Sequence, residues 1–181
     1  RKEYVASRLA LSEFMSVYNG TVDDGWDEYF NYGGLPLVLS CRTLEEKSEY
    51  LVSQFRKVYL SDLIDRHKIR NAEEFDELID VLASSVGSLT NPVKLANTFK
   101  SVKGKTISDK TLKKYLDYLM DAFLINKSKR YDVKGRKYIN SPAKYYFEDI
   151  GLRNARLEFR QNEENHIMEN IIYNELCVRG F

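Results

Sequence analysis

An amphipathic stretch between Thr106 and Leu124 constrains the fold more than any other part of this 181-residue chain. Its large apolar residues recur at intervals of three and four, which is the period of a helix with one buried side. Those residues are Leu112, Tyr115, Leu116, Leu119, Met120 and Phe123. Ser108 stands at the N-cap position, and Asp109 puts a negative charge in the first turn. We therefore expect a helix over 108–124 that buries this apolar side and exposes Lys110, Lys113 and Lys114 on the other.

Short extended runs follow this helix. Residues 125–133, 135–139 and 143–149 read as strands, and they are separated by Lys134-Gly135 and by Asn140-Ser141-Pro142. A basic helix followed by a small β-ribbon is the outline of a winged helix. The sequence therefore predicts a mainly helical, α+β fold in which residues 67–150 form a winged-helix domain.

The rest of the chain reads as helices. Capping residues, glycines and apolar periodicity indicate helices over 11–18, 21–32, 43–66, 71–87, 91–99 and 162–179. Thr43 and Glu46 are spaced as a capping box, and Pro92 occupies the first turn of its helix. We expect residues 1–66 to form a helical region before the winged helix, and residues 151–181 to form a linker and one further helix.

The charge of the chain is concentrated in its centre. Residues 98–144 carry 13 Lys/Arg against 4 Asp/Glu, whereas residues 1–97 carry 11 against 16 and residues 145–181 carry 4 against 7. Such a cationic segment indicates an anionic partner, and DNA is the partner that a basic helix and ribbon would contact. The candidate residues are Lys110, Lys113, Lys114, Lys127, Lys129, Arg130, Lys134, Arg136 and Lys137. The alternative interpretation is a solvated lysine face that binds nothing.

Motifs for nucleotide or metal chemistry are incomplete. Gly104-Lys105-Thr106 copies the end of a P-loop, but Phe99 stands where the motif needs its first glycine, and a helix precedes it where a strand is required. Neither His67 nor His166 has partners at metal-binding spacing. We therefore expect neither a catalytic site nor a metal or cofactor site in this chain.

Two carboxylate pairs have structural interpretations. Glu148 and Asp149 follow a strand, where we expect them to cap the next helix rather than bind a metal. Glu169 and Glu175 are six residues apart, so on a straight helix they point about 120° away from each other.

Composition places the chain among cytoplasmic globular proteins. No run approaches the roughly 18 apolar residues of a membrane span, and the first ten residues lack the apolar region of a signal peptide. Cys41 and Cys177 are far apart in sequence and lack the CxxC spacing of zinc or redox sites, so we expect free thiols.

Six sequence blocks in this order closely resemble the C-terminal half of bacterial and archaeal AAA+ type ATPases. The blocks are Tyr32–Pro36, Val58–Leu63 with Arg66, Leu116–Leu124, Arg130–Gly135, Lys144–Asp149 and Gly151–Ala155. The resemblance covers residues 11–181. It implies that an ATPase core with Walker motifs, binding ATP and Mg²⁺, precedes a segment such as this one.

The resemblance also implies a third domain, similar to restriction-endonuclease-like folds. The segment His166–Leu176 resembles the first helix of that domain, and Glu169 matches its helix glutamate. The other acidic and lysine positions of such a nuclease would lie beyond Phe181. Residues 151–181 are thus expected to be a linker and the first helix of a truncated nuclease-like domain. The whole chain is then a non-catalytic fragment whose winged helix contacts DNA or, alternatively, other proteins or ATPase domains.

Overall fold

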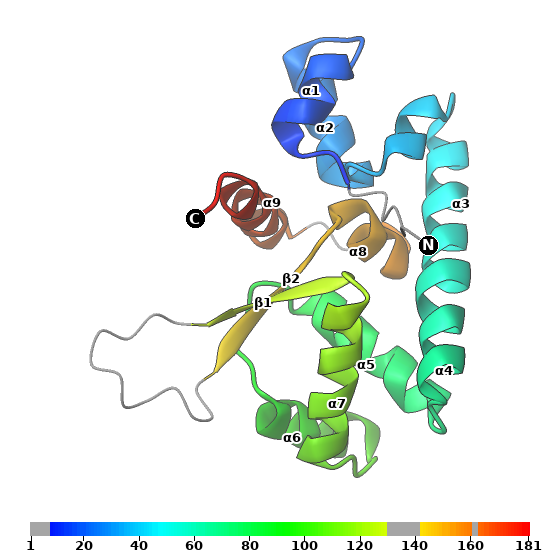
Figure 1. Ribbon diagram of the computed structural model, residues 1–181, viewed down its shortest axis with the longest axis vertical. Coiled ribbons are helices and arrows are strands. Elements are labelled where there is room, and N and C mark those ends of the chain that lie inside the picture. The colour runs from blue at the N-terminus through cyan, green and yellow to red at the C-terminus, as the bar shows by residue number, and fades with distance from the viewer. Residues whose placement is uncertain (1–7, 130–141, 161–162) are drawn as a thin grey trace, which may run out of the picture.

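The computed structural model describes residues 8–129, 142–160 and 163–181, which form mainly helices and a two-stranded antiparallel sheet (Figure 1). The first elements are α1 (Leu11–Val17), α2 (Val22–Tyr32), the 3-10 helix η1 (Pro36–Ser40), α3 (Leu44–Gln54), the π-helix η2 (Phe55–Ser61) and α4 (Asp62–His67). They are followed by α5 (Ala72–Ser84), α6 (Pro92–Lys103), α7 (Asp109–Asp121), β1 (Ile125–Lys129), β2 (Ala143–Phe147), α8 (Ile150–Arg156) and α9 (Glu164–Val178). The predicted α+β class with a small ribbon is confirmed.

Helix α8 lies at the centre of the molecule, between the α1–α3 region and the sheet (Figure 1). Asp149 caps it, as the sequence predicted: its carboxylate accepts a hydrogen bond from the Leu152 N–H at 3.0 Å. The same carboxylate accepts from the Gly34 N–H at 2.8 Å, far away in sequence. One buried side chain therefore starts α8 and attaches it to the end of α2.

Glycines allow this close approach. Gly33 has a φ of 73°, which is accessible at little cost only to glycine. A Cβ atom on Gly34 would lie 2.2 Å from the Leu9 carbonyl oxygen, and one on Gly151 would lie 2.0 Å from the Tyr32 carbonyl oxygen. The blocks Tyr32–Pro36 and Gly151–Ala155 are thus the two sides of one backbone junction.

Two polar side chains extend the junction into the core. Arg153 is fully buried, and its Nε donates to the Ala83 carbonyl at the end of α5 at 2.9 Å. Its Nη1 donates to Asn154 Oδ1 at 3.0 Å, and Asn154 Nδ2 donates to the carbonyls of Phe30 and Asn31. Burial lowers the pKa of the Arg153 guanidinium. Helix α8 therefore connects α2 with α5 through hydrogen bonds as well as apolar contacts.

The buried apolar residues form two clusters. The larger contains residues from η1 to α8, and the smaller joins Phe14, Tyr29, Ile150, Ile167 and Ile171. Apolar contacts therefore cross both predicted domain boundaries, after residues 66 and 150. The division into three sequence units stays a prediction.

Helix α7 has the predicted orientation over most of its length. Leu112, Tyr115, Leu116 and Leu119 are buried, and Ser108 caps the helix by accepting from the Thr111 N–H at 3.0 Å. Lys110, Lys113 and Lys114 are exposed.

Phe123 was predicted to be buried with the α7 stripe, and this is wrong. The helix ends at Asp121, and Phe123 adopts a φ of 54° with 59% of its surface exposed. The Leu124 N–H bonds back to the Leu119 carbonyl at 3.0 Å, which is the pattern of a Schellman closure. This turn directs Phe123 away from the core and puts Leu124 into it.

Two further predicted helices differ from the sequence pattern. The helix over 43–66 exists but is interrupted by the π-helix η2, which apolar periodicity does not reveal. Helix α6 continues to Lys103, one turn beyond the predicted end at Phe99, before Gly104 closes it with a φ of 65°.

Helix α9 attaches to the end of β2 through buried amides. Asn170 Oδ1 accepts from the Phe147 N–H, and Asn170 Nδ2 donates to the Phe147 carbonyl, both at 2.8 Å. Asn174 Nδ2 donates to the same carbonyl at 3.0 Å. These bonds satisfy backbone groups that the two-stranded sheet leaves unpaired.

We predict that Leu116→Ala destabilises the fold by about 2–5 kcal/mol, because it opens a cavity in a packed core. Lys113→Ala on the exposed side of the same helix should change stability by less than about 0.5 kcal/mol. Urea unfolding of both variants checks this, and similar losses for the two would contradict the orientation of α7.

A second prediction concerns the attachment of α9. Asn170→Ala leaves the buried Phe147 N–H without its acceptor, which should cost about 1–3 kcal/mol. Hydrogen exchange at the Phe147 amide should accelerate in this variant. Asn165→Ala, an exposed position on the same helix, is the control and should change neither quantity. Unaltered protection of Phe147 in Asn170→Ala would show that α9 is held by other contacts.

Candidate functional site

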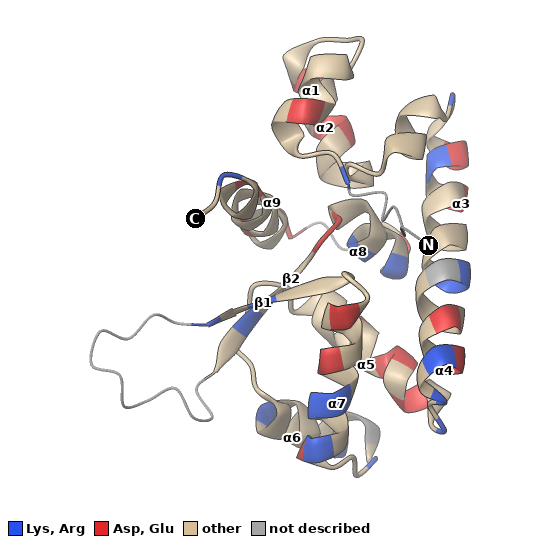
Figure 2. Ribbon diagram, viewed as in Figure 1, with Lys and Arg blue, Asp and Glu red and all other residues tan. Residues whose placement is uncertain are grey.

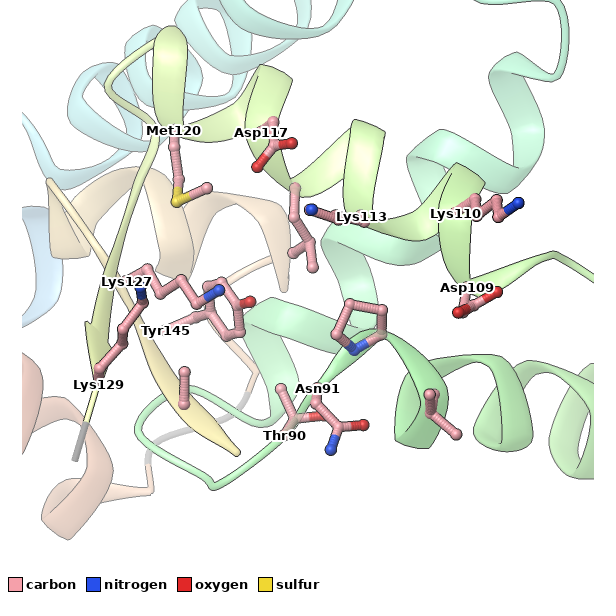
Figure 3. A pocket seen from close by; sticks show the side chains of 14 residues that line it. Thr90, Asn91, Asp109, Lys110, Lys113, Asp117, Met120, Lys127, Lys129 and Tyr145 are labelled. Atoms are coloured by element: carbon pink, nitrogen blue, oxygen red, sulfur yellow. The ribbon is translucent and has the colours of Figure 1, made fainter. Parts of the chain in front are cut away.

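A cavity of about 260 Å³ lies between α6, α7 and the sheet, and several of the predicted cationic residues line it (Figure 3). The start of α6, the exposed side of α7 and one face of the ribbon form its walls. Its lining residues are Thr90, Asn91, Pro92, Val93, Asp109, Lys110, Lys113, Leu116, Asp117, Met120, Lys127, Lys129, Ala143 and Tyr145.

Local geometry explains why four lysines reach this cavity. Lys110 and Lys113 are three residues apart on α7, so they share one side of the helix. Lys127 and Lys129 are two residues apart on β1, so they share one face of the sheet. β1 pairs with β2 in the register Lys127 opposite Tyr145, which brings this face against α7. The structure thus brings together four of the nine predicted cationic residues.

Of the other five predicted residues, only Lys114 lies in the described part of the chain. The Nζ atom of Lys114 lies 5.5 Å from the centre of the Tyr118 ring, and Lys114 is not among the lining residues. Tyr118 itself stacks on His67 from α4, with ring centres 3.6 Å apart. Arg130, Lys134, Arg136 and Lys137 lie outside the described residues.

The four cavity lysines form no ion pair with a carboxylate of the described residues. Elsewhere lysines form ion pairs, such as Lys47 with Glu28 at 2.6 Å and Lys144 with Glu169 at 2.7 Å. Among residues 8–129, 142–160 and 163–181, no carboxylate lies within ion-pairing distance of the four cavity lysines, which are Lys110, Lys113, Lys127 and Lys129.

The surroundings of Lys127 disfavour the charged form of its side chain. Partial burial lowers the pKa of the Lys127 ammonium, and so do the charges of Lys129 and Lys113, while Asp117 opposes the change. Its Nζ lies 5.9 Å from the centre of the Tyr145 ring. Burial raises the pKa of the Tyr145 hydroxyl to about 12, so this ring stays neutral at neutral pH. A bound anion would restore the preference of Lys127 for its charged form.

Carboxylates and apolar side chains complete the lining. Asp109 and Asp117 stand beside the lysines on α7, and Asp121 follows in its last turn. The positive charge of α7 is therefore concentrated in its first half, whereas its second half is acidic (Figure 2). The apolar part of the lining comes from Pro92, Val93, Leu116, Met120 and Ala143.

Sequence reasoning missed the contribution of the segment before α6. Thr90 and Ala143 exchange both backbone hydrogen bonds, at 2.9 and 2.8 Å, and this bridge places the start of α6 beside the sheet. The Asn91-Pro92 pair signalled a helix start, and Asn91 Oδ1 does accept from the Lys94 N–H. A single bridging residue between two helices leaves no periodic signal that could have predicted its pairing.

The remaining sequence candidates have structural roles. Helix α6 precedes Gly104-Lys105-Thr106, and the Lys105 ammonium pairs with Glu73 at 3.0 Å and Glu77 at 3.4 Å. Within the described part of the chain, no group of three His, Cys, Asp or Glu side chains could hold a metal ion. None of the described helices is long and apolar enough to cross a membrane.

Glu169 and Glu175 point to different partners, as their spacing indicated. Glu169 accepts hydrogen bonds from Lys144 and Tyr146 on β2. Partial burial would raise the pKa of Glu169, but these two donors outweigh it and lower the value. Glu175 instead accepts from the Leu11 N–H at 2.6 Å and so holds the start of α1.

A second cavity, of about 220 Å³, lies beside the π-helix η2 and contains charges that neutralise each other. Arg156 in its wall pairs with Asp76 at 2.8 Å and with Asp80 at 2.5 Å. Its guanidinium also lies 5.5 Å from the centre of the Phe55 ring. This cavity thus presents a satisfied ion-pair network to a ligand.

Comparison with known proteins identifies relatives but gives no activity. The chain is 35% identical over 179 residues to an uncharacterized protein of Haemophilus influenzae, covering 96% of this chain and 44% of that protein. It is 31% identical over 155 residues to the uncharacterized protein MJ1544 of Methanocaldococcus jannaschii, covering 86% of this chain and 34% of that protein. The chain thus spans less than half the length of these curated relatives.

No solved structure matches this chain with statistical significance. A family model described as a domain of unknown function, DUF8612, matches residues 23–163. The match begins in α2, includes the whole cavity and ends at the residue before α9. Because it covers most of the chain, this protein belongs to the DUF8612 family.

Proposed function

We propose that this chain is a non-catalytic module that binds nucleic acid, contacting phosphates through the lysines of the cavity between α7 and β1. The observation that carries the proposal is that Lys113, Lys127 and Lys129, from α7 and β1, line one cavity, with Lys110 at its edge. Lysines that neutralise phosphates release counterions, and this release favours binding. If these lysines served only to keep the surface hydrated, nothing would favour their meeting at one cavity from two different elements.

The element order supports a winged helix as the framework of this module. Helix α5, the Thr90 bridge, α6, α7 and the β1–β2 ribbon follow one another as the helices and short strands of a winged helix do. In such an arrangement α7 is the helix that approaches the nucleic acid, with the ribbon beside it. The basic first half of α7 and the exposed lysines of β1 are then on the binding side.

Contacts to phosphates rather than to bases account best for the composition of α7. Its exposed positions carry lysine and aspartate, whereas base edges are read mainly by arginine, asparagine and glutamine. Asp117 and Asp121 would repel phosphates from its second half. We therefore propose sequence-independent binding through the first half of α7 and through β1.

The module belongs, in this proposal, to a longer cytoplasmic ATPase. The greater length of the curated relatives leaves room for further domains, and the sequence resemblance to AAA+ type ATPases suggests one of them. ATP and Mg²⁺ would bind in that core rather than in this chain. Helix α9, with Glu169 on it, would then begin the nuclease-like domain.

A protein-binding role is the second candidate, and the mixed lining of the cavity favours it. Asp109 and Asp117 alternate with lysines, and Pro92, Val93 and Met120 add apolar surface. A peptide or another domain of the same ATPase would use both kinds of group. An electrophoretic mobility assay with DNA at several salt concentrations separates the two roles.

We predict that the double substitution Lys113→Ala with Lys127→Ala weakens binding to two duplexes of unrelated sequence to the same extent. The slope of log affinity against log salt should fall by roughly 0.9 for each phosphate that the variant no longer neutralises. Lys57→Ala removes an exposed lysine of η2 that is not among the residues lining the cavity, and it is the matched control. Fluorescence anisotropy with labelled duplexes measures these quantities.

Folding should be unaffected in the double variant, because exposed lysines contribute little to stability, on the order of 0.5 kcal/mol or less. An unchanged affinity in the double variant, or no binding by the intact chain at low salt, would remove nucleic acid from the proposal. The protein-binding role would then remain.

A further inference from the structure

The size of the cationic cavity suggests what part of a nucleic acid it holds. A cavity of about 150 Å³ accommodates benzene. The cavity here measures about 260 Å³. By simple proportion it has room for roughly ten non-hydrogen atoms, which is the size of a nucleobase. A phosphate group alone, with five such atoms, would leave about half of this space empty.

The lining separates into an apolar wall and a cationic edge. Pro92 and Val93 at the start of α6, with Leu116 and Met120 of α7, contribute the larger aliphatic side chains of the lining. In Figure 3, Lys113 and Lys127 extend into the space between α7 and β1, whereas Lys110 extends away from it. An apolar ring with an attached anion matches this arrangement better than an anion alone does.

We propose that the cavity accepts one unpaired nucleotide of a single-stranded nucleic acid, and this inference rests on the nucleic-acid-binding function proposed above. The base packs against Val93, Leu116 and Met120, and the adjoining phosphate lies among Lys113, Lys127 and Lys129. The carboxylate of Asp117 repels the phosphate, so the backbone follows β1 rather than the second half of α7.

Base pairing explains why the nucleotide is unpaired. A base inside a duplex is stacked and paired, so it enters a protein pocket only after it leaves the stack, at a cost in free energy. A single strand avoids most of that cost. The chain therefore prefers single strands to blunt duplexes, although both contact the same lysines.

Two exposed valines on α6 give a matched test. Val93 lines the cavity with 54% of its surface exposed, so Val93→Phe fills the pocket without disturbing the core. Val102 lies in the last turn of the same helix, outside the lining and 70% exposed, so Val102→Phe is the control. Circular dichroism and thermal unfolding establish that both variants fold as the unsubstituted chain does.

The probes are a labelled single-stranded DNA of about 20 nucleotides and the blunt duplex of the same sequence, both at low salt. Loss of the apolar packing of one base corresponds to about a fivefold fall in affinity. Anisotropy titrations should therefore show that Val93→Phe weakens single-strand binding about fivefold or more. Duplex binding by this variant, and both affinities of Val102→Phe, should stay unchanged.

The outcomes distinguish the two levels of the proposal. If the intact chain binds neither probe, the nucleic-acid function fails, and this inference fails with it. If the chain binds both probes but Val93→Phe leaves single-strand affinity unchanged, or lowers both affinities equally, the nucleotide pocket alone is overturned.

Discussion

The structure depends on one buried carboxylate at the start of α8. Asp149 accepts backbone hydrogen bonds from Gly34, at the end of α2, and from Leu152, in the first turn of α8. Burial raises the pKa of Asp149, and these N–H donors oppose that effect by stabilising the carboxylate. Gly33 must lack a side chain for this contact, since a Cβ on it would lie 2.4 Å from Asp149 Oδ1. This interaction joins the end of α2 to the start of α8, two segments that are far apart in sequence.

The same junction also positions the candidate site, through strand β2. β2 ends at Phe147, two residues before Asp149, so fixing α8 also fixes the strand that pairs with β1. Asn170 holds the other side of the strand end through both backbone groups of Phe147. The register of the ribbon then sets which residues of β1 face α7. The position of the cavity lysines on β1 thus depends on contacts that hold the ribbon to the core.

Sequence patterns predicted the local features of this architecture and missed the long-range ones. The buried side of α7 and the cap at Asp149 follow from helical periodicity and from capping chemistry, which involve neighbours in sequence. Phe123 was misplaced because a Schellman closure shifts the side chain that follows the last turn. The Thr90 bridge and the position of Lys114 outside the cavity depend on how separate elements pack. Which four of the predicted lysines line the cavity is likewise decided by tertiary packing.

The net charge of the chain does not reveal the local concentration of lysines at the cavity. The chain carries a formal charge of only +1, since acidic residues outside its centre balance the basic ones. Many of those acids are already used within the fold: Glu28 binds Lys47, and Asp76 binds Arg156. An approaching polyanion responds to the local potential, and a concave low-dielectric wall strengthens that potential. Lysines that converge on a hollow therefore favour an anionic ligand more strongly than the charge of the whole chain indicates.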